Sequence, residues 1–199
     1  MTGLALVLAT VLGVPLGAAI GLSRFPGRKV VALVLYTGMG LPPVVVGLVV
    51  YMALSRSGPA GDLGWLFTPA AMVAAQTIIA FPLVAGLTMS AVEGVDPELR
   101  RQVRALGATK TQLAWTVLRE ARLGVTAALV AAFGGIISEV GAVMLVGGNI
   151  EGQTRVLTTA VVLYTRQGDF ALAMAMGLVL IALTLLANAA LIQLQGRSR

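Results

Sequence analysis

Five long runs of apolar residues dominate the chain, and short polar segments separate them. The runs cover residues 2–22, 30–54, 69–92, 124–147 and 169–195. A helix needs about 20 mostly apolar residues to cross the roughly 30 Å hydrocarbon layer of a bilayer. The pattern therefore predicts an all-α fold: a polytopic transmembrane bundle of five spans, with residues 1–199 forming a single membrane domain.

The composition of the chain supports a membrane protein. Hydrophobic residues make up 58% of the 199 residues and charged residues only 11%, and the mean hydropathy is +0.94. A soluble domain carries about 25% charged residues, so this chain has too few charges to cover a surface that faces water. The first apolar run has no basic segment before it and is longer than the core of a signal peptide, so we expect a retained first span.

Several classes of chemistry are excluded by missing residue types. The chain has no cysteine and no histidine. Disulfides, thiolate or imidazole metal sites, and Cys–His or Ser–His catalysis are therefore ruled out. The segment Gly107-Ala-Thr-Lys-Thr111 lacks the spacing of a phosphate-binding P-loop. We expect no catalytic residue, bound metal or cofactor in this chain.

The basic residues are distributed unequally between the two sides of the predicted bundle. The net charge of +6 would suggest nucleic acid in a soluble protein, but here the placement of the charges matters more, and no nucleic-acid partner is expected. Eleven of the fourteen basic residues fall on the same side: Arg24, Arg28, Lys29, Arg100, Arg101, Arg104, Lys110, Arg119, Arg122, Arg197 and Arg199. Cytoplasmic loops are enriched in Lys and Arg, so the N-terminus is predicted outside and the C-terminus in the cytoplasm of a multi-pass inner-membrane protein.

The long polar loop at residues 93–123 predicts two short helices joined at a glycine. Asp96 before Pro97 is a typical helix start. Leu99, Val103 and Leu106 then fall on one apolar stripe. Gly107 is placed to end this helix with a positive φ angle, and the sequence from Thr109 to Gln112 predicts a capping box for the next helix.

Two interpretations of this loop follow from its residues alone. A basic amphipathic helix binds anionic membrane lipid readily, so the loop can be an elbow that lies on the bilayer. An apolar stripe on a projecting tip can instead fit a groove in a soluble partner.

The loop also resembles the cytoplasmic coupling loop of ABC importer permeases. Ala105-Leu106-Gly107-Ala108 is similar to the surroundings of that loop's invariant glycine, while Arg101-Gln102-Val103 stands where the family has Glu-Ala-Ala. The resemblance implies contact with a nucleotide-binding subunit, which would hold ATP and Mg²⁺. The residues expected to couple to it are Glu98, Leu99, Arg101, Gln102, Val103, Ala105, Leu106, Gly107 and Ala108.

Further segments are similar to the permeases of tungstate-type oxyanion importers, relatives of the molybdate permeases. They are Gly40-Leu-Pro-Pro-Val-Val-Val-Gly47, Arg56-Ser-Gly-Pro59, Phe67-Thr-Pro-Ala-Ala-Met72, Ile137-Ser-Glu-Val-Gly-Ala142, Val146-Gly-Gly-Asn149 and Gly168-Asp-Phe170. The resemblance implies an ATP-driven importer built from a homodimer of permeases, two ATP-binding cassette subunits and an extracytoplasmic substrate-binding protein.

Candidate residues of a translocation pathway lie within or beside the predicted spans. Pro42 and Pro43 predict a kink in the second span, which serves either packing or a pore-lining bend. Glu139 is an ionisable residue deep in the predicted fourth span, beside Ser138. A hydrogen-bonded structural role is one interpretation of Glu139, and a proton carrier in an ion-coupled secondary transporter is the alternative.

The outer loop before the fifth span is rich in hydrogen-bond donors. It holds Asn149, Gln153, Thr154, Arg155, Thr158 and Thr159. Hydrogen-bond donors with few carboxylates among them can bind an oxyanion, but the same residues are equally typical of a hydrated turn. Asn149 and Thr158 are the pathway candidates chosen from this loop. In the first span, Gly13, Gly17 and Gly21 recur every four residues and predict close helix packing.

Overall fold

The computed structural model describes residues 1–196, and it describes side chains as far as residue 190 and at residue 193. Within this part of the chain the regular structure is helical, with one short 3-10 turn and no strand. This confirms the predicted all-α class. Arg197 and Arg199, which contributed to the predicted orientation, lie outside the described residues.

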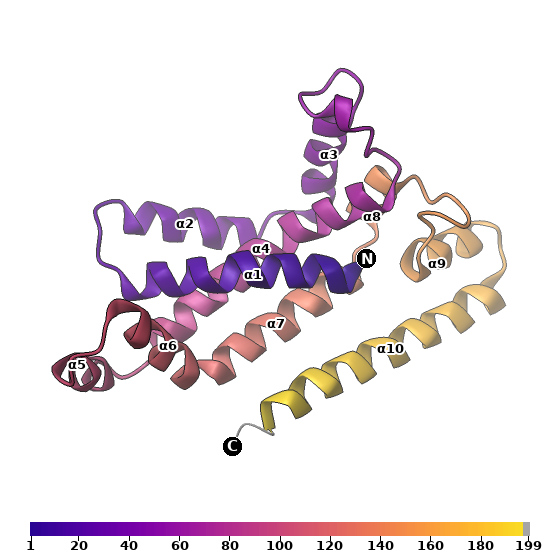
Figure 1. The fold of residues 1–199 in the computed structure, drawn as a ribbon. Helices are drawn as coiled ribbons and strands as arrows, with labels where there is room; N and C mark the ends of the chain where they lie inside the picture. The colour runs from indigo at the N-terminus through magenta and orange to yellow at the C-terminus, as the bar shows by residue number, and fades with distance from the viewer. Residues whose placement is uncertain (197–199) are drawn as a thin grey trace.

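Ten α-helices and the turn η1 follow one another along residues 1–196 (Figure 1). Their bounds are α1 Thr2–Leu22, α2 Arg28–Met39, α3 Pro43–Leu54, η1 Gly61–Leu63, α4 Pro69–Glu93, α5 Pro97–Ala105, α6 Lys110–Glu120, α7 Arg122–Ile137, α8 Gly141–Gly147, α9 Leu157–Arg166 and α10 Phe170–Gly196.

Three of these helices are long and apolar enough to cross a membrane as they stand. They are α1, α4 and the Phe170–Ala190 part of α10, and two bent helix pairs raise the number to five if each pair is one span. The predicted spans 2–22, 69–92 and 169–195 therefore agree with continuous helices to within a few residues. The other two predicted spans need correction.

The predicted span 30–54 is not one helix. It divides into α2 and α3, which meet at an angle of 100°. The predicted span 124–147 is also divided: α7 ends at Ile137, and the separate helix α8 begins at Gly141. At its other end α7 makes a 70° bend with α6. Apolar runs of this length predicted continuous helices, but the chain breaks within both of them.

Close packing of α1 on α4 forms the centre of the bundle. An added Cβ at Gly13 or Gly21 would press on Val84 or Val92, and one at Gly17 would overlap the carbonyl oxygen of Ala85. Three glycines spaced by four residues thus let the two helix backbones approach directly, as in other small-residue interfaces of membrane helices. The glycine ridge predicted from the sequence is confirmed as packing within the chain.

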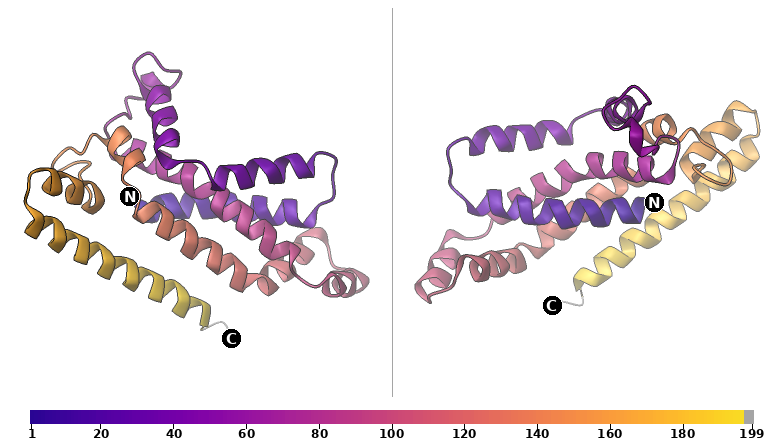
Figure 2. Two further views of the ribbon diagram at one scale, coloured as in Figure 1. Left: turned by 180° about the vertical axis from the view of Figure 1, so that it is seen from behind. Right: turned by 45° about the horizontal axis from the view of Figure 1, so that its top comes forward.

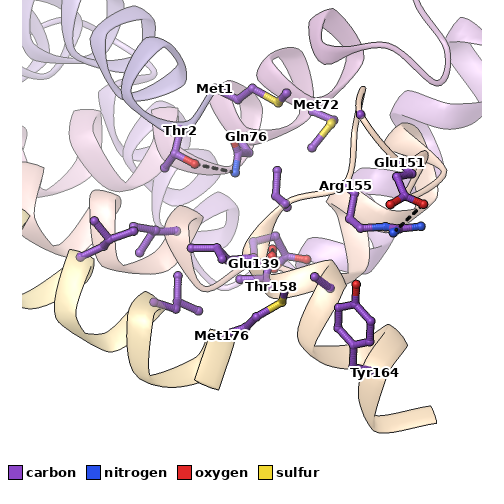
Figure 3. Close-up of a pocket in the computed structure, with 17 residues that line it drawn as sticks. Met1, Thr2, Met72, Gln76, Glu139, Glu151, Arg155, Thr158, Tyr164 and Met176 are labelled. Carbon is purple, nitrogen blue, oxygen red and sulfur yellow. Dashed lines mark hydrogen bonds and ion pairs between the residues drawn. The ribbon is translucent and has the colours of Figure 1, made fainter. Parts of the chain in front are cut away.

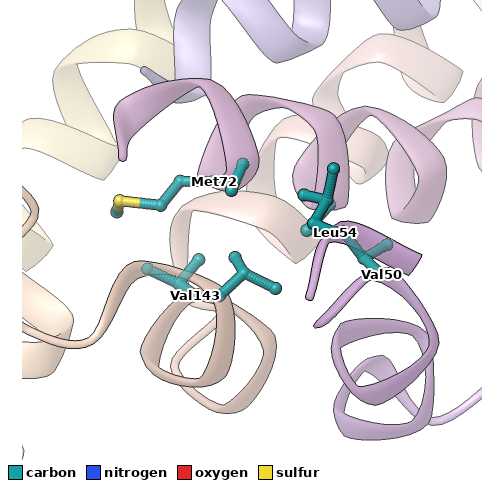
Figure 4. Packing of buried hydrophobic residues seen from close by; sticks show 7 residues of the cluster. Val50, Leu54, Met72 and Val143 are labelled. Carbon is teal, nitrogen blue, oxygen red and sulfur yellow. The ribbon is translucent and has the colours of Figure 1, made fainter. Parts of the chain in front are cut away.

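A second packing centre joins α3, α4 and α8 (Figure 4). Val50 and Leu54 of α3 meet Met72 of α4 and Val143 of α8. Gly47 lies so close to Ala142 that a Cβ would not fit between the two helices. These contacts hold α3 across the end of the bundle after the sharp turn that separates it from α2.

The loops predicted to be cytoplasmic lie at the same end of the molecule. Arg28, at the start of α2, pairs with Glu93 at the end of α4, and its Nε also donates to the carbonyl of Ile20 at 3.0 Å. Helices α5 and α6 lie at this end, and the N-terminus lies at the other (Figure 1). The structure therefore groups residues 24–29 with residues 93–123, while the direction of the bundle in the membrane stays a prediction.

Helix α10 lies to one side of the bundle, as the views in Figures 1 and 2 agree. It contacts α9 and α7 but leaves most of its apolar surface uncovered. Several large apolar side chains of α3 are also exposed, among them Val45, Leu48 and Met52. In a membrane protein such surfaces face lipid or another membrane subunit.

Candidate functional site

The loop at residues 93–123 folds as two short helices around a glycine corner. The carboxylate of Asp96 accepts from the N–H of Glu98 at 2.8 Å and caps α5. At the other end, Gly107 has a φ of +82°, and the N–H of Ala108 donates to Val103 at 3.3 Å. Thr109 and Gln112 cap α6 reciprocally. The predicted helix starts and the positive φ at Gly107 are confirmed.

The predicted apolar stripe of this loop is divided between two environments. Leu99 and Val103 pack against a cluster that includes Leu113 and Val117 of α6, so they hold α5 to α6. Leu106, by contrast, is 88% exposed. The three residues of the predicted stripe therefore differ in burial. Helix α5 ends at Ala105, and Leu106 follows it as the C-cap residue, where its side chain is exposed.

The exposed surface of α5, α6 and the turn between them, here the tip, bears two large apolar side chains amid charged residues. Trp115 of α6 is 71% exposed, like Leu106. Glu98 and Arg101 form an exposed ion pair at 2.7 Å, and Gln102 and Ala105 are also exposed. Exposed Leu and Trp on a polar tip suit a groove in a partner protein, because large apolar anchors carry most of the energy of such contacts.

Pro42 and Pro43 form the break between α2 and α3 rather than a kink inside one helix. Pro43 is the first residue of α3, where a missing N–H costs no helical hydrogen bond, and Pro42 precedes it with extended backbone. Both prolines line a cavity that also borders Pro82 of α4 and Gly135 of α7. The prolines thus lie at the point where the chain turns by 100° from α2 into α3.

Glu139 lies in the break between α7 and α8, not deep inside a continuous helix as predicted. Its Oε1 accepts from the N–H of Ala142 at 2.7 Å and so satisfies a free donor in the first turn of α8. Its backbone carbonyl accepts from the hydroxyl of Thr158 at 3.3 Å. This geometry agrees with a hydrogen-bonded structural role. Ser138 does not share in it, because its hydroxyl donates to Gly134 at 2.8 Å.

A cavity of about 620 Å³ lies beside this break (Figure 3). Its walls come from the start of α1, from α4, from the loop before α9, from α9 itself and from α10. Two predicted pathway residues, Glu139 and Thr158, line it, whereas Asn149 and the two prolines do not. Asn149 instead turns the chain after α8 with a φ of +52°.

Three polar residues of this cavity come from α4, from the loop before α9 and from α9 itself, and one of them was already a donor candidate. Arg155 belongs to the donor-rich loop, but Gln76 of α4 and Tyr164 of α9 were not predicted as site residues. Gln76 interrupts an otherwise apolar span, and this signal could have marked it. Tyr164 gave no comparable signal, because an aromatic residue near the end of a membrane helix is ordinary.

Comparison with known proteins gives a consistent result over almost the whole chain. The family described as "Binding-protein-dependent transport system inner membrane component" matches residues 13–198. A "Probable anion ABC transporter permease protein" of Haloferax volcanii is 48% identical over 190 residues, which cover 93% of this chain and 82% of that protein.

Two further proteins extend the comparison. The "Tungstate uptake system permease protein TupB" of Peptoclostridium acidaminophilum is 42% identical over 191 residues, which cover 96% of this chain and 84% of that protein. Among solved structures, an amino acid ABC transporter with histidines matches the fold with a TM-score of 0.69 at 20% identity, over 98% of this chain and 88% of that one.

Proposed function

This chain belongs to the inner membrane components of binding-protein-dependent transport systems, and from that premise we propose that it is the permease of an ATP-driven importer for tungstate or a related oxyanion such as molybdate. The observation that carries the substrate class is the 42% identity to a tungstate uptake permease over 84% of that protein's length. The multi-pass helical bundle, with its mostly apolar outer surface, suits such a membrane subunit.

The energy for transport is supplied by a separate ATPase subunit that holds ATP and Mg²⁺. The tip formed by Leu106 and Trp115 is the docking element, because it presents apolar anchors at the end of the molecule where the basic loops gather. Leu99 and Val103 act indirectly, by fixing α5 on α6 so that the tip keeps its shape.

The complete importer contains two copies of this chain, two ATPase subunits and one extracytoplasmic binding protein. The exposed apolar surfaces of α3 and α10 support association with a second copy, because the described chain covers neither of them. Family membership supports the ATPase and the binding protein as partners.

An ion-coupled secondary transporter, with Glu139 as the proton carrier, is disfavoured by both family and geometry. Members of this family work with a binding protein. The Glu139 carboxylate is also occupied as a helix cap through its bond to Ala142.

The docking assignment is tested by co-purification of the chain with its ATPase in detergent. Replacing Leu106 with alanine removes one apolar anchor, and loss of such an anchor costs about 1.4 kcal/mol or more, which is tenfold in affinity. Leu63→Ala is the matched control, because Leu63 is a 53% exposed leucine on η1, far from the tip. We expect Leu106→Ala to weaken ATPase binding at least tenfold and Leu63→Ala to leave it unchanged.

Two results would contradict the proposal in different ways. If both variants and the unaltered chain bind the ATPase with equal affinity, the tip is not part of the docking surface. Failure of the unaltered chain to bind any ATP-binding cassette subunit would contradict the importer itself.

A further inference from the structure

The cavity beside the α7–α8 break contains buried polar atoms that lack partners among the described residues. Gln76 is only 4% exposed, and its Nε2 donates to the carbonyl of Ile136 at 3.0 Å and to the Thr2 hydroxyl at 3.3 Å. Since a carbonyl can only accept, the amide nitrogen must face Ile136, and Oε1 is left buried without a partner. Buried polar atoms are nearly always hydrogen-bonded, which makes this lone amide oxygen unusual among the side chains that line the cavity.

Arg155 lines the cavity across from Gln76, and its side chain is 23% exposed. Its Nε is buried and has no partner in the described structure. One terminal nitrogen pairs with Glu151 at 3.3 Å, but the Glu151 side chain is 82% exposed. An ion pair with so exposed a carboxylate contributes little, so an anion inside the cavity competes with it readily. Figure 3 shows the Tyr164 hydroxyl directed toward this guanidinium.

The position of Arg155 is fixed by the fold of the preceding loop. Thr154 is fully buried, and its hydroxyl donates to Gly147 at 2.5 Å and accepts from the N–H of Ile150 at 2.9 Å. These bonds tie the loop to the end of α8. The backbone at Arg155 is therefore fixed in advance of any ligand, which reduces the entropy lost on binding.

Charge differs between the two ends of the cavity. Arg155 and Tyr164 supply donors at one end, where Glu151 balances the charge of Arg155 in the empty cavity, while the carboxylate of Glu139 lies beside the break. A fully ionised tetrahedral oxyanion has only acceptor atoms. It is attracted to the guanidinium and repelled by Glu139, so its position is confined to the Arg155 end.

From these observations we infer that Arg155 and Tyr164 form a binding station for a tetrahedral oxyanion inside the permease. Glu151 pairs with Arg155 when the station is empty and is displaced by the anion. Glu139 keeps the anion from advancing toward the break between α7 and α8. This inference rests on the proposed function, because it assumes an oxyanion as the transported solute.

Direct binding to the intact permease–ATPase complex, without the binding protein, tests the station. Equilibrium dialysis with radiolabelled tungstate gives Kd for each variant. We expect Arg155→Gln to raise Kd at least tenfold, Arg155→Lys to raise it less because the charge remains, and Tyr164→Phe to raise it about threefold. Glu151→Gln should lower Kd, because the competing carboxylate is gone.

Arg166→Gln is the matched control. It removes the same charge from the exposed end of α9, outside the cavity lining, and should leave Kd unchanged. Co-purification of each variant with the ATPase verifies that it has folded. ATP-driven tungstate uptake into proteoliposomes with the binding protein present should fall at least tenfold for Arg155→Gln.

Each other outcome overturns the inference in a recognisable way. Unchanged Kd and uptake for Arg155→Gln would show that Arg155 does not bind the anion, while the proposed importer function would stand. Lost uptake with an unchanged Kd would assign Arg155 to the docking of the binding protein instead. If the unaltered complex neither binds nor carries tungstate, molybdate or sulfate, the proposed function fails and the station fails with it.

Discussion

A substitution at Gly107 tests how the backbone conformation of the tip affects docking, without the effect of side-chain clashes. Its φ is +82°, and a Cβ added there would meet no atom within 4 Å. A substitution is therefore costly only through backbone strain, which for a β-branched residue at positive φ amounts to about 1–3 kcal/mol. Asparagine tolerates this conformation far better than valine.

We predict that Gly107→Val weakens ATPase binding about tenfold or more and stops transport, while the bundle still folds and inserts. Gly107→Asn should stay close to the unaltered protein in both measurements. Binding affinity for the ATPase, measured in detergent, checks the prediction. Normal affinity and normal uptake in the valine variant would favour the elbow that lies on lipid.

Glu139 gives a second test at the scale of one side chain. Glutamine keeps the oxygen that accepts from Ala142, so Glu139→Gln should retain at least a third of the ATP-driven uptake. Alanine removes the cap and should lower stability by about 0.5–2 kcal/mol, seen as a lower melting temperature in detergent. Uptake that vanishes in the glutamine variant, or that needs an imposed proton gradient, would restore the proton-carrier interpretation.

The sequence predicted local backbone chemistry better than the surroundings of side chains. Asp96, Gly107 and Thr109 each have a short-range role, and each fulfils it as predicted. The stripe did not predict the exposure of Leu106, because its periodicity does not show that only Leu99 and Val103 pack against α6. The sequence marked Arg155 only as one of several hydrogen-bond donors in its loop. Its burial and its partners depend on how that loop folds against α8.

At the scale of helices, the packing of α1 against α4 should control the stability of the bundle. Gly17 has no room for a side chain beside Ala85, whereas a Cβ at Gly3 meets no neighbour within 4 Å. Overpacking a tight contact costs about 1–3 kcal/mol. We therefore predict a clear drop in the melting temperature of Gly17→Val in detergent, with Gly3→Val as the control. Equal melting temperatures of the two variants would show that this interface contributes little.

The breaks inside two apolar runs could not have been predicted from the runs themselves. Pro42 and Pro43 are compatible with a modest kink or with a complete turn. The choice depends on contacts such as Gly47 against Ala142, which join segments almost a hundred residues apart. Likewise, Ser138 and Glu139 carry no strong helix-breaking signal, and the break there is stabilised by Thr158 from α9.

At the scale of the whole molecule, the orientation in the membrane is open to direct measurement. The native chain has no cysteine, so single cysteines can be introduced without background. We predict that a cysteine at Lys110, on the α5–α6 tip, reacts with impermeant reagents only from the cytoplasmic side. A cysteine at Asp62 on η1, at the opposite end of the molecule, should react only from outside. The reverse labelling pattern would show that the bundle has the opposite orientation in the membrane.

The helical class and the three continuous spanning helices followed from the distribution of apolar residues, since lipid imposes a minimum length on every span. The cavity did not follow from it. It is assembled from α1, α4, α9 and α10 and from two loops, and only the folded chain brings Gln76, Arg155 and Tyr164 to one place. The composition therefore indicated a membrane protein, and the family resemblance indicated a transporter, but neither showed where its solute binds.

Uptake of radiolabelled tungstate into proteoliposomes tests the central claim most directly. The vesicles would contain this chain and its ATPase, with the binding protein on the face from which solute enters and ATP on the other. We predict uptake that requires both ATP and the binding protein and that persists when a protonophore abolishes the proton gradient. Uptake that proceeds without ATP and stops with the protonophore would contradict the account.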